Sequence, residues 1–174
     1  MNSDTLQADA RRTTDSRRFE DAIRKARLPG VLPRLADIDF QKISDLMPWV
    51  AMIRPDASQR MLRITMAGCA FTEMQGHSLI DLDYLDFVDP TVKGEAFDST
   101  FVMLARPCGV WQLSPVTYVD DSAGTLELTG FPVIDSVRGC GLVIYLIRKV
   151  TAMQTNRIMT VKHASEWHWL DMKS

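Results

Sequence analysis

The stretch Trp111–Val150 constrains the fold most, because it reads as three β-rich runs separated by two turns. The turns, Asp120–Gly124 and Asp135–Gly139, are rich in residues that favour chain reversal. Strand-like runs joined by about five such residues are typical of an antiparallel meander. The last run, Gly141–Ile147, is apolar on both faces. We therefore expect it to be covered twice, either by its own chain or by a partner subunit.

The middle run of this meander alternates in polarity. Leu126, Leu128 and Gly130 point to one side, and threonine and glutamate side chains point to the other. The following Phe131-Pro132 is typical of a bulge or an edge position. The meander forms the floor of the expected fold, and nothing in it resembles a catalytic pattern.

Composition restricts the class of protein. The 174 residues suit one domain with flanking segments, and 46% apolar with 24% charged residues is ordinary for a globular protein. A net charge of −2 provides no basic field for nucleic acid or an anionic membrane. No apolar stretch approaches the roughly 20 residues of a membrane helix. We expect neither a nucleic-acid partner nor a membrane.

The cysteines and the N-terminus indicate the compartment. Cys69, Cys108 and Cys140 are odd in number and widely spaced, which favours reduced thiols. The first residues lack the charged and then apolar pattern of a secretory signal. We therefore expect a cytoplasmic protein.

The N-terminal part predicts a polar, disordered tail over residues 1–14 and a helical segment over 15–31. Asp15 or Ser16 is suited to cap the helix, and Pro29-Gly30 ends it. Its apolar side chains fall on one face. That face packs either on a neighbouring subunit or on its own sheet, and the sequence favours neither.

Residues 32–150 form the predicted main domain, and residues 151–174 a C-terminal extension. Two strands are expected at Trp49–Arg54 and Arg60–Met66, followed by short helices. A longer helix is expected from Pro90 to Ala105, because its apolar residues repeat at helical spacing. The fold class is therefore α+β, with a five-stranded antiparallel sheet, short helices and one longer helix on one face, plus the N-terminal helix. An α+β barrel of the nuclear-transport-factor type shares much of this order.

Short motifs add a resemblance. Pro33, Asp37-Ile38-Asp39 and the Leu46-x-Pro48 step precede the first strand, with Leu35 where a second basic residue is common. Later come Ala67-Gly68, Gly76 and the step Arg106-Pro107. Together, over about residues 19–150, they resemble a family of short bacterial PAS proteins. The resemblance implies a fold with a cavity between the long helix and the sheet, and sensing of a small molecule or a protein. It implies no common catalytic residues.

Cofactor chemistry has few candidates. Haem-binding PAS domains place a histidine on or near the long helix, which here has none, so haem is expected only if His77 reaches the cavity. His163 and His168 are five residues apart, which suits neither a helix nor a strand pair for a metal. Cys69 lacks the asparagine and arginine of a flavin-adduct motif. We expect neither haem nor flavin.

Enzyme motifs are equally sparse. The chain has no Gly-x-Ser-x-Gly, no phosphate loop and no His-Glu-x-x-His. An acidic run lacks the spacing of a calcium loop, and we interpret its members as helix caps and solvated side chains. The run comprises Asp81, Asp83, Asp86 and Asp89.

The leading hypothesis is a stand-alone sensor or interaction module that binds a small apolar or amphipathic molecule. No kinase, cyclase or DNA-binding segment is present, so a separate output protein is expected, together with a homodimer. The alternatives are a small cone-shaped isomerase or dehydratase, and a ligand-free dimerisation domain. Apolar and aromatic side chains are expected to line the ligand pocket. They are Phe97, Phe101, Leu104, Trp111, Tyr118, Leu126, Leu128 and Tyr145.

Overall fold

The computed structural model describes residues 11–27, 31–151 and 157–172, and its elements follow the chain in a simple order. Helix α2 and three short 3-10 turns (η1–η3) precede two strands, and helical segments then lead to the meander. The bounds are α2 (Thr14–Lys25), η1 (Leu35–Asp37), η2 (Phe40–Ile43), η3 (Met47–Trp49), β1 (Val50–Asp56), β2 (Met61–Ala67), α3 (Cys69–Gln75), η4 (Tyr84–Phe87), α4 (Lys93–Ala105), β3 (Cys108–Tyr118), β4 (Ala123–Asp135), β5 (Cys140–Lys149), β6 (Ile158–Val161) and β7 (Glu166–Asp171).

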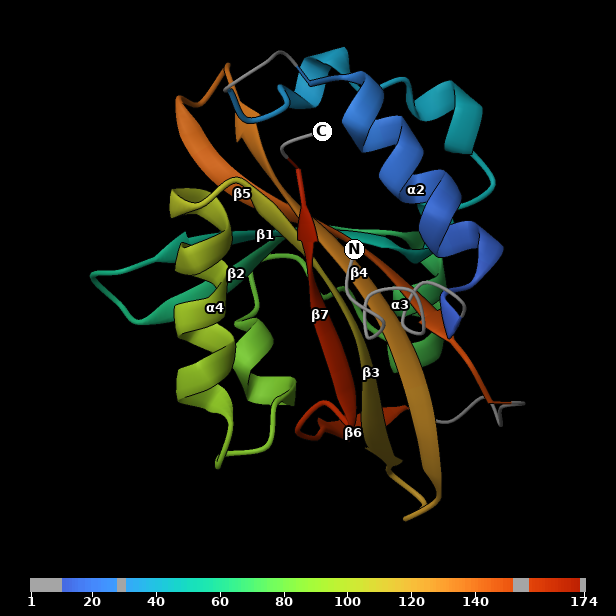
Figure 1. Ribbon diagram of the computed structural model, residues 1–174. Helices are drawn as coiled ribbons and strands as arrows, with labels where there is room; N and C mark the ends of the chain where they lie inside the picture. Colours follow the sequence, from blue (N-terminus) through green and yellow to red (C-terminus); the bar gives the residue numbers. More distant parts are fainter. Residues whose placement is uncertain (1–10, 28–30, 152–156, 173–174) are drawn as a thin grey trace.

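All strands form one antiparallel sheet, with the order β2-β1-β5-β4-β3 (Figure 1). Both β6 and β7 pair with the outer side of β3. The α+β prediction is therefore confirmed, but the sheet has seven strands and not five. The two extra strands come from the predicted C-terminal extension, residues 151–174, for which no strand was expected.

Helices cover opposite faces of this sheet (Figure 1). We call them the α4 face and the α2 face after the helix that lies on each. Side chains of β5 alternate between them: Leu142, Ile144 and Leu146 join the cluster under α2, while Val143 and Tyr145 join the cluster at α4. The doubly apolar strand is thus covered on both sides by its own chain, because β5 is central.

Helix α2 lies on its own sheet, which resolves the alternative that the sequence left open. Phe19 and Ile23 are fully buried in the same cluster as Phe131 and Val133 of β4. The helix begins after the cap Thr13, whose side chain accepts a hydrogen bond from the Ser16 amide. This burial removes the main reason for expecting a partner subunit over the helix.

The predicted disordered tail falls mostly outside the described residues. Within residues 11–14, however, Arg12 is buried, with Nη2 near Glu20 Oε2 at 2.5 Å, and Thr13 bonds to Glu127. These residues belong to the folded unit. The division into a main domain and an extension stays a prediction.

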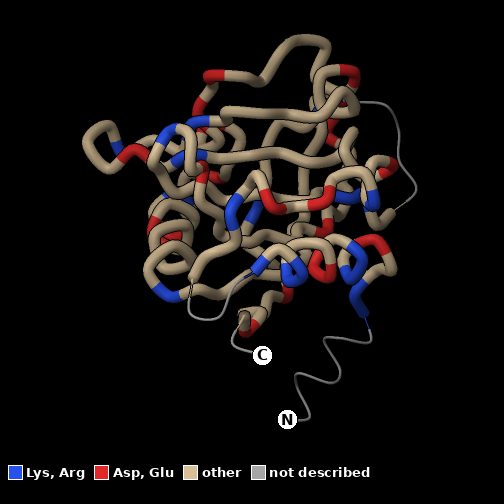
Figure 2. The backbone as a smooth tube through the Cα atoms, turned by 90° about the horizontal axis from the view of Figure 1, so that it is seen from above, with Lys and Arg blue, Asp and Glu red and all other residues tan. Residues whose placement is uncertain are grey.

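Two findings concern the hydropathy of the helices and the distribution of charge. No helix in the described part of the chain is long and apolar enough to cross a membrane. Figure 2 shows the basic and acidic residues intermixed along the backbone.

Candidate functional site

Three neighbouring hollows lie on the α4 face. The largest is an open groove of about 620 Å³ between α4 and the strands β3 and β7. Beneath it are two smaller cavities of about 60 and 50 Å³ between the sheet and the segments α3, η4 and α4. We call the first the β7 groove and the other two the inner cavities. Leu128, Ile147, Ile53 and Tyr84 line both inner cavities, so the two are adjacent.

Side chains of the paired strands β3 and β7 form one wall of the β7 groove. Trp167 lies opposite Gln112 and Trp169 opposite Val110, so their side chains share the α4 face. The indoles meet edge to face with centroids 5.5 Å apart and are 44% and 41% exposed. Large exposed aromatic surface beside a groove is a common feature of binding sites.

Helix α4 forms the opposite wall. Glu95, Ser99 and Val102 line the groove at spacings of four and three residues, which places them on one side of the helix. Glu95 Oε2 lies 3.4 Å from His163 Nε2, and so joins the helix to the loop between β6 and β7 at the mouth. Both of these side chains are more than half exposed, so the pair contributes little to stability.

Tyr84 is the residue that connects the groove with the inner cavities, because it lines all three. It begins η4, which is capped by the Asp83 carboxylate accepting from the Leu85 amide. Burial raises the pKa of the Tyr84 phenol to about 12. Its hydroxyl makes no hydrogen bond with any described residue. A half-buried phenol without a protein partner retains a free donor and acceptor.

Two further polar side chains face the same region. The Tyr145 hydroxyl donates to Met103 Sδ at 3.7 Å, and burial, followed by the neighbouring Tyr84, raises the pKa of Tyr145 above its usual range. Gln112 donates from Nε2 to Ser114 Oγ at 2.8 Å. This bond leaves the Gln112 amide oxygen as an available acceptor.

The inner cavities contain no Asp, Glu, Lys, Arg or His among their lining residues. Their polar groups are hydroxyls and amides. A charged ligand would lose its hydration there without an ionic partner, at a cost of several kcal/mol or more. The arrangement therefore suits a neutral molecule with hydrogen-bonding groups.

The predicted pocket residues divide into three groups. Leu126, Leu128 and Tyr145 line the inner cavities. Phe97 and Phe101 pack against β1 and β2 in a separate cluster, with their ring centroids 4.9 Å apart. Leu104 contacts the face of β5 at Gly141, where an added Cβ would lie 2.7 Å from it. The inner stripe of α4 is therefore mostly core, because the helix packs tightly on β1 and β5.

Trp111 and Tyr118 lie elsewhere. Trp111 is on the α2 face, fully buried, with its indole N–H donating to Glu127. The structure thus corrects its expected place among the pocket residues, because Trp111 lines none of the hollows on the α4 face. Tyr118 is fully buried against Val116 and Val161 at the far end of β3. The contribution of any predicted residue to ligand binding stays a prediction.

The residues that sequence reasoning missed are Tyr84, Gln112, Trp167 and Trp169. The alternation Trp167-His168-Trp169 is a strand signal of period two, but we expected no strand in the C-terminal extension. Tyr84 gave no such signal, because its position depends on how η4 folds onto the sheet.

The metal and haem candidates remain apart from this site. His77 is exposed, with Nδ1 3.0 Å from the Gln75 carbonyl oxygen, and it lines none of these hollows. Across residues 11–27, 31–151 and 157–172, no three His, Cys, Asp or Glu side chains gather as metal ligands. Asp83 caps η4 by accepting a hydrogen bond from the Leu85 amide, which confirms the capping interpretation for this residue. Asp89 accepts from the Thr91 amide in the turn before α4 and does not cap that helix, because the N-cap of α4 is Val92.

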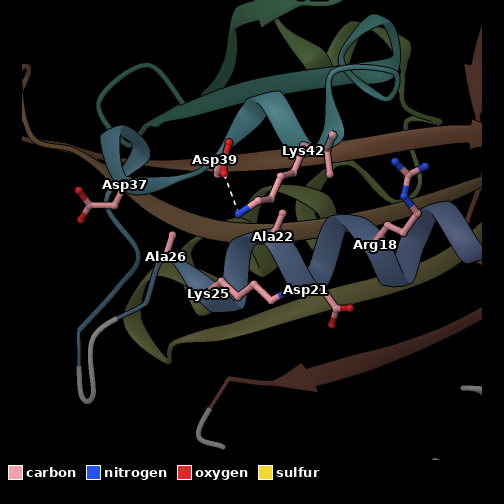
Figure 3. Close-up of a pocket in the computed structure, with 9 residues that line it drawn as sticks. Arg18, Asp21, Ala22, Lys25, Ala26, Asp37, Asp39 and Lys42 are labelled. Atoms are coloured by element: carbon pink, nitrogen blue, oxygen red, sulfur yellow. Dashed lines mark ion pairs between the residues drawn. The ribbon is translucent and has the colours of Figure 1, made fainter.

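A fourth hollow lies on the other side of the molecule, between α2 and the segment 37–43 (Figure 3). It measures about 350 Å³. Lys42 Nζ reaches Asp39 Oδ2 at 2.9 Å on one wall, and Lys25 lies along α2 on the other. Charges of both signs alternate around it without a buried polar group, so we assign it no ligand.

Comparisons with known proteins provide little beyond this geometry. No family model and no curated protein matches the chain. Solved structures that it resembles include VqmA bound to DPO, at 18% identity, and the Vibrio cholerae VqmA dimer in the absence of target DNA, also at 18%. A third is a VqmA–ligand–DNA complex at 19% identity.

In all three, the TM-score is 0.47 and the match covers 64% of this chain. This chain spans only 57%, 52% and 51% of the respective VqmA chains. A likeness of this size supports neither a ligand nor a DNA partner for this chain.

Proposed function

We propose that this chain is a PAS-like sensor module that binds a small neutral molecule with an apolar body on the α4 face of its sheet. The single observation that carries the proposal is the Tyr84 phenol, which faces three adjoining hollows and whose hydroxyl has no hydrogen-bond partner among the described residues. The strand order β2-β1-β5-β4-β3, with a helix across one face, supports the PAS-like assignment.

The ligand would enter through the β7 groove, whose volume of about 620 Å³ is within the range of small-molecule sites. Its body would lie between the indoles of β7 and Ser99 or Val102 of α4. Hydrogen bonds to Tyr84 and to the amide of Gln112 would orient it. An apolar substituent would occupy the inner cavities, beside Leu128.

An enzyme of the isomerase or dehydratase type is less well supported. Such an enzyme needs an acid–base pair that faces its cavity. The most buried carboxylate, Glu127, lies on the α2 face and accepts hydrogen bonds from Trp111 and Thr13, so it faces none of the hollows on the α4 face. A ligand-free dimerisation domain is also less well supported. It would give no role to the Tyr84 hydroxyl, which has no hydrogen-bond partner among the described residues.

The test uses two leucine-to-phenylalanine changes on opposite faces. Leu128 borders the inner cavities, so Leu128→Phe fills space and should leave the melting temperature nearly unchanged. Leu142 lies in the tightly packed cluster under α2, so Leu142→Phe should cost ~1–3 kcal/mol and several degrees.

Ligand binding is measured by native mass spectrometry of the purified protein and by the thermal shift that indole causes. Indole serves as a neutral probe with one N–H donor. We expect a positive shift in the wild type, loss of the shift in Leu128→Phe, and an affinity about two- to tenfold weaker in Gln112→Leu. The proposal is contradicted if both phenylalanine changes destabilise the protein equally, indole causes no thermal shift and no ligand co-purifies. The chain would then be a module with a filled core.

Assembly as a homodimer and output through a separate protein are part of the proposal. Exposed apolar side chains outside the β7 groove are available for assembly, among them Val119 and Val137 at two hairpin tips. Light scattering at micromolar concentration should give twice the chain mass, and a monomer that persists on concentration excludes the dimer.

A further inference from the structure

Strand β7 lies between the β7 groove and helix α2. Among the described strands it pairs with β3 and with no other. Its side chains alternate: Trp167 and Trp169 face the groove, whereas Glu166, His168 and Leu170 face the opposite side. A displacement of the β7 backbone at the two indoles would therefore also move groups that lie on the α2 face.

The end of β7 is fixed to the C-terminal half of α2. Arg24 Nη2 donates to the Asp171 carbonyl oxygen at 2.5 Å, while its Nε bonds Glu20 Oε1 at 2.6 Å. Met172, the next residue, is fully buried in the cluster that contains Phe19 and Ile23. The helix and the end of the strand thus share a hydrogen bond and a common apolar core.

The beginning of β7 reaches the N-terminus of α2 by a second route. The His168 ring stacks on Trp111, with centroids 5.7 Å apart and planes inclined by 16°. Trp111 donates to Glu127, and the Glu127 carboxylate accepts from the backbone N–H and the hydroxyl of Thr13, the residue that caps the helix. Glu166 also pairs with Arg11 at 2.7 Å.

We propose that β7 couples the β7 groove to the docking of α2, so that a molecule bound between the indoles and α4 changes how firmly this helix is held. The proposal rests on the proposed function for its ligand, but the coupling is a property of the chain itself. An edge strand paired on one side shifts at lower cost than a central one. By thermodynamic linkage the effect is reciprocal: loosening α2 must alter the groove.

The first experiment perturbs the groove and observes the helix, without any ligand. Amide hydrogen exchange is followed in the peptide spanning α2. Trp169→Ala should speed exchange there by about fivefold or more, the lower end of usual couplings. Val102→Ala is the matched control, since it lines the same groove from α4 and has no connection through β7. Equal exchange of α2 in the two variants overturns the proposal.

The second experiment perturbs the helix and observes the groove. The protein is labelled with 5-fluorotryptophan, and its four tryptophan signals are assigned by single replacement with phenylalanine. Arg24→Ala should shift the Trp167 and Trp169 signals. Arg18→Ala, on the same helix but paired with Asp45 instead of β7, should leave them unchanged. If Arg24→Ala leaves both signals in place, the coupling does not exist.

Indole then links the two questions. With the wild type, saturating indole should alter exchange in α2, and Arg24→Ala should change the affinity for indole. If indole fails to bind while both variant experiments succeed, the coupling stands and the proposed ligand class is wrong. If indole binds and α2 exchange is unaffected, the sensor stands and the coupling is overturned.

Discussion

The indole N–H of Trp111 donates to the Glu127 carboxylate at 2.7 Å, and both residues are almost completely buried on the α2 face. The same carboxylate accepts from the Thr13 amide at 3.0 Å. One acidic side chain of β4 therefore joins the neighbouring strand β3 to Thr13, the residue that caps the N-terminal helix. A buried carboxylate is tolerated when it is fully hydrogen-bonded, as here.

Glu127 should be among the most sensitive polar positions in the protein. Glu127→Ala leaves the Trp111 indole and the Thr13 amide without their acceptor, so we expect a loss of roughly 3 kcal/mol in the free energy of unfolding. Glu127→Gln keeps one acceptor and should lose less. Urea denaturation measures both changes. The control is Glu166→Gln, because the Glu166 side chain is also paired, with Arg11, but is 23% exposed. If Glu127→Ala is no worse than this control, the network contributes nothing to stability.

Gly130 and Gly94 should respond in opposite directions to alanine. At Gly130 a new Cβ would lie 2.3 Å from the Tyr145 ring, which is enclosed between the sheet and α4, so we expect a loss of about 1–3 kcal/mol. At Gly94, inside α4, no atom lies within 4 Å of an added Cβ. Gly94→Ala should stabilise by up to about 1 kcal/mol through helix propensity. Thermal unfolding of the two variants and the wild type measures both changes in stability. If Gly130→Ala is as stable as the wild type, the Tyr145 ring is loosely held.

Alkaline pH should destabilise the fold through Tyr84. Burial raises its pKa from 10.0 to about 12, so between these pH values the unfolded chain loses a proton that the folded protein keeps. The free energy of unfolding must therefore fall as the pH rises through this window. Tyr84→Phe should make the fall shallower, with the remainder due to Tyr145 and Tyr118, whose pKa values are also raised by burial. Urea unfolding at pH 9, 10 and 11 measures the slope, and an unchanged slope in Tyr84→Phe contradicts the assignment.

The purified protein should be colourless. His77 lines none of the hollows on the α4 face, and Cys69 is exposed at the start of α3. Neither a haem ligand nor a flavin-reactive thiol therefore faces the site. An absorbance scan checks this directly, and a stoichiometric Soret band that disappears in His77→Ala would reverse the expectation.

The meander was the most predictable part of the fold. Its three runs, its two turns and the long helix could be predicted because alternation, helical spacing and turn-forming residues act over a few neighbours. The alternation of β4 also correctly grouped Leu126 with Leu128, which both line the inner cavities. The period-two alternation along a strand determines which residues share a face, whatever packs against that face.

The candidate site was less predictable, because its walls come from distant parts of the chain. Tyr84, Gln112 and Trp167 meet only after η4 folds onto the sheet and β7 pairs with β3. The large aromatic side chain of Trp111 is suited to line a pocket. In β3, however, successive side chains point to opposite faces of the sheet, so Gln112 faces the β7 groove and Trp111 lies on the α2 face.

The sequence by itself determined the α+β class, the order of the central elements and the two faces of each strand, since these follow from local spacing and backbone preference. Only the tertiary structure decided that α2 covers its own sheet, that residues 158–171 extend it as β6 and β7, and that Tyr84 faces the hollows. These outcomes depend on long-range burial and on polar groups such as Glu127 finding partners more than a hundred residues away. No pattern confined to neighbouring residues contains that information.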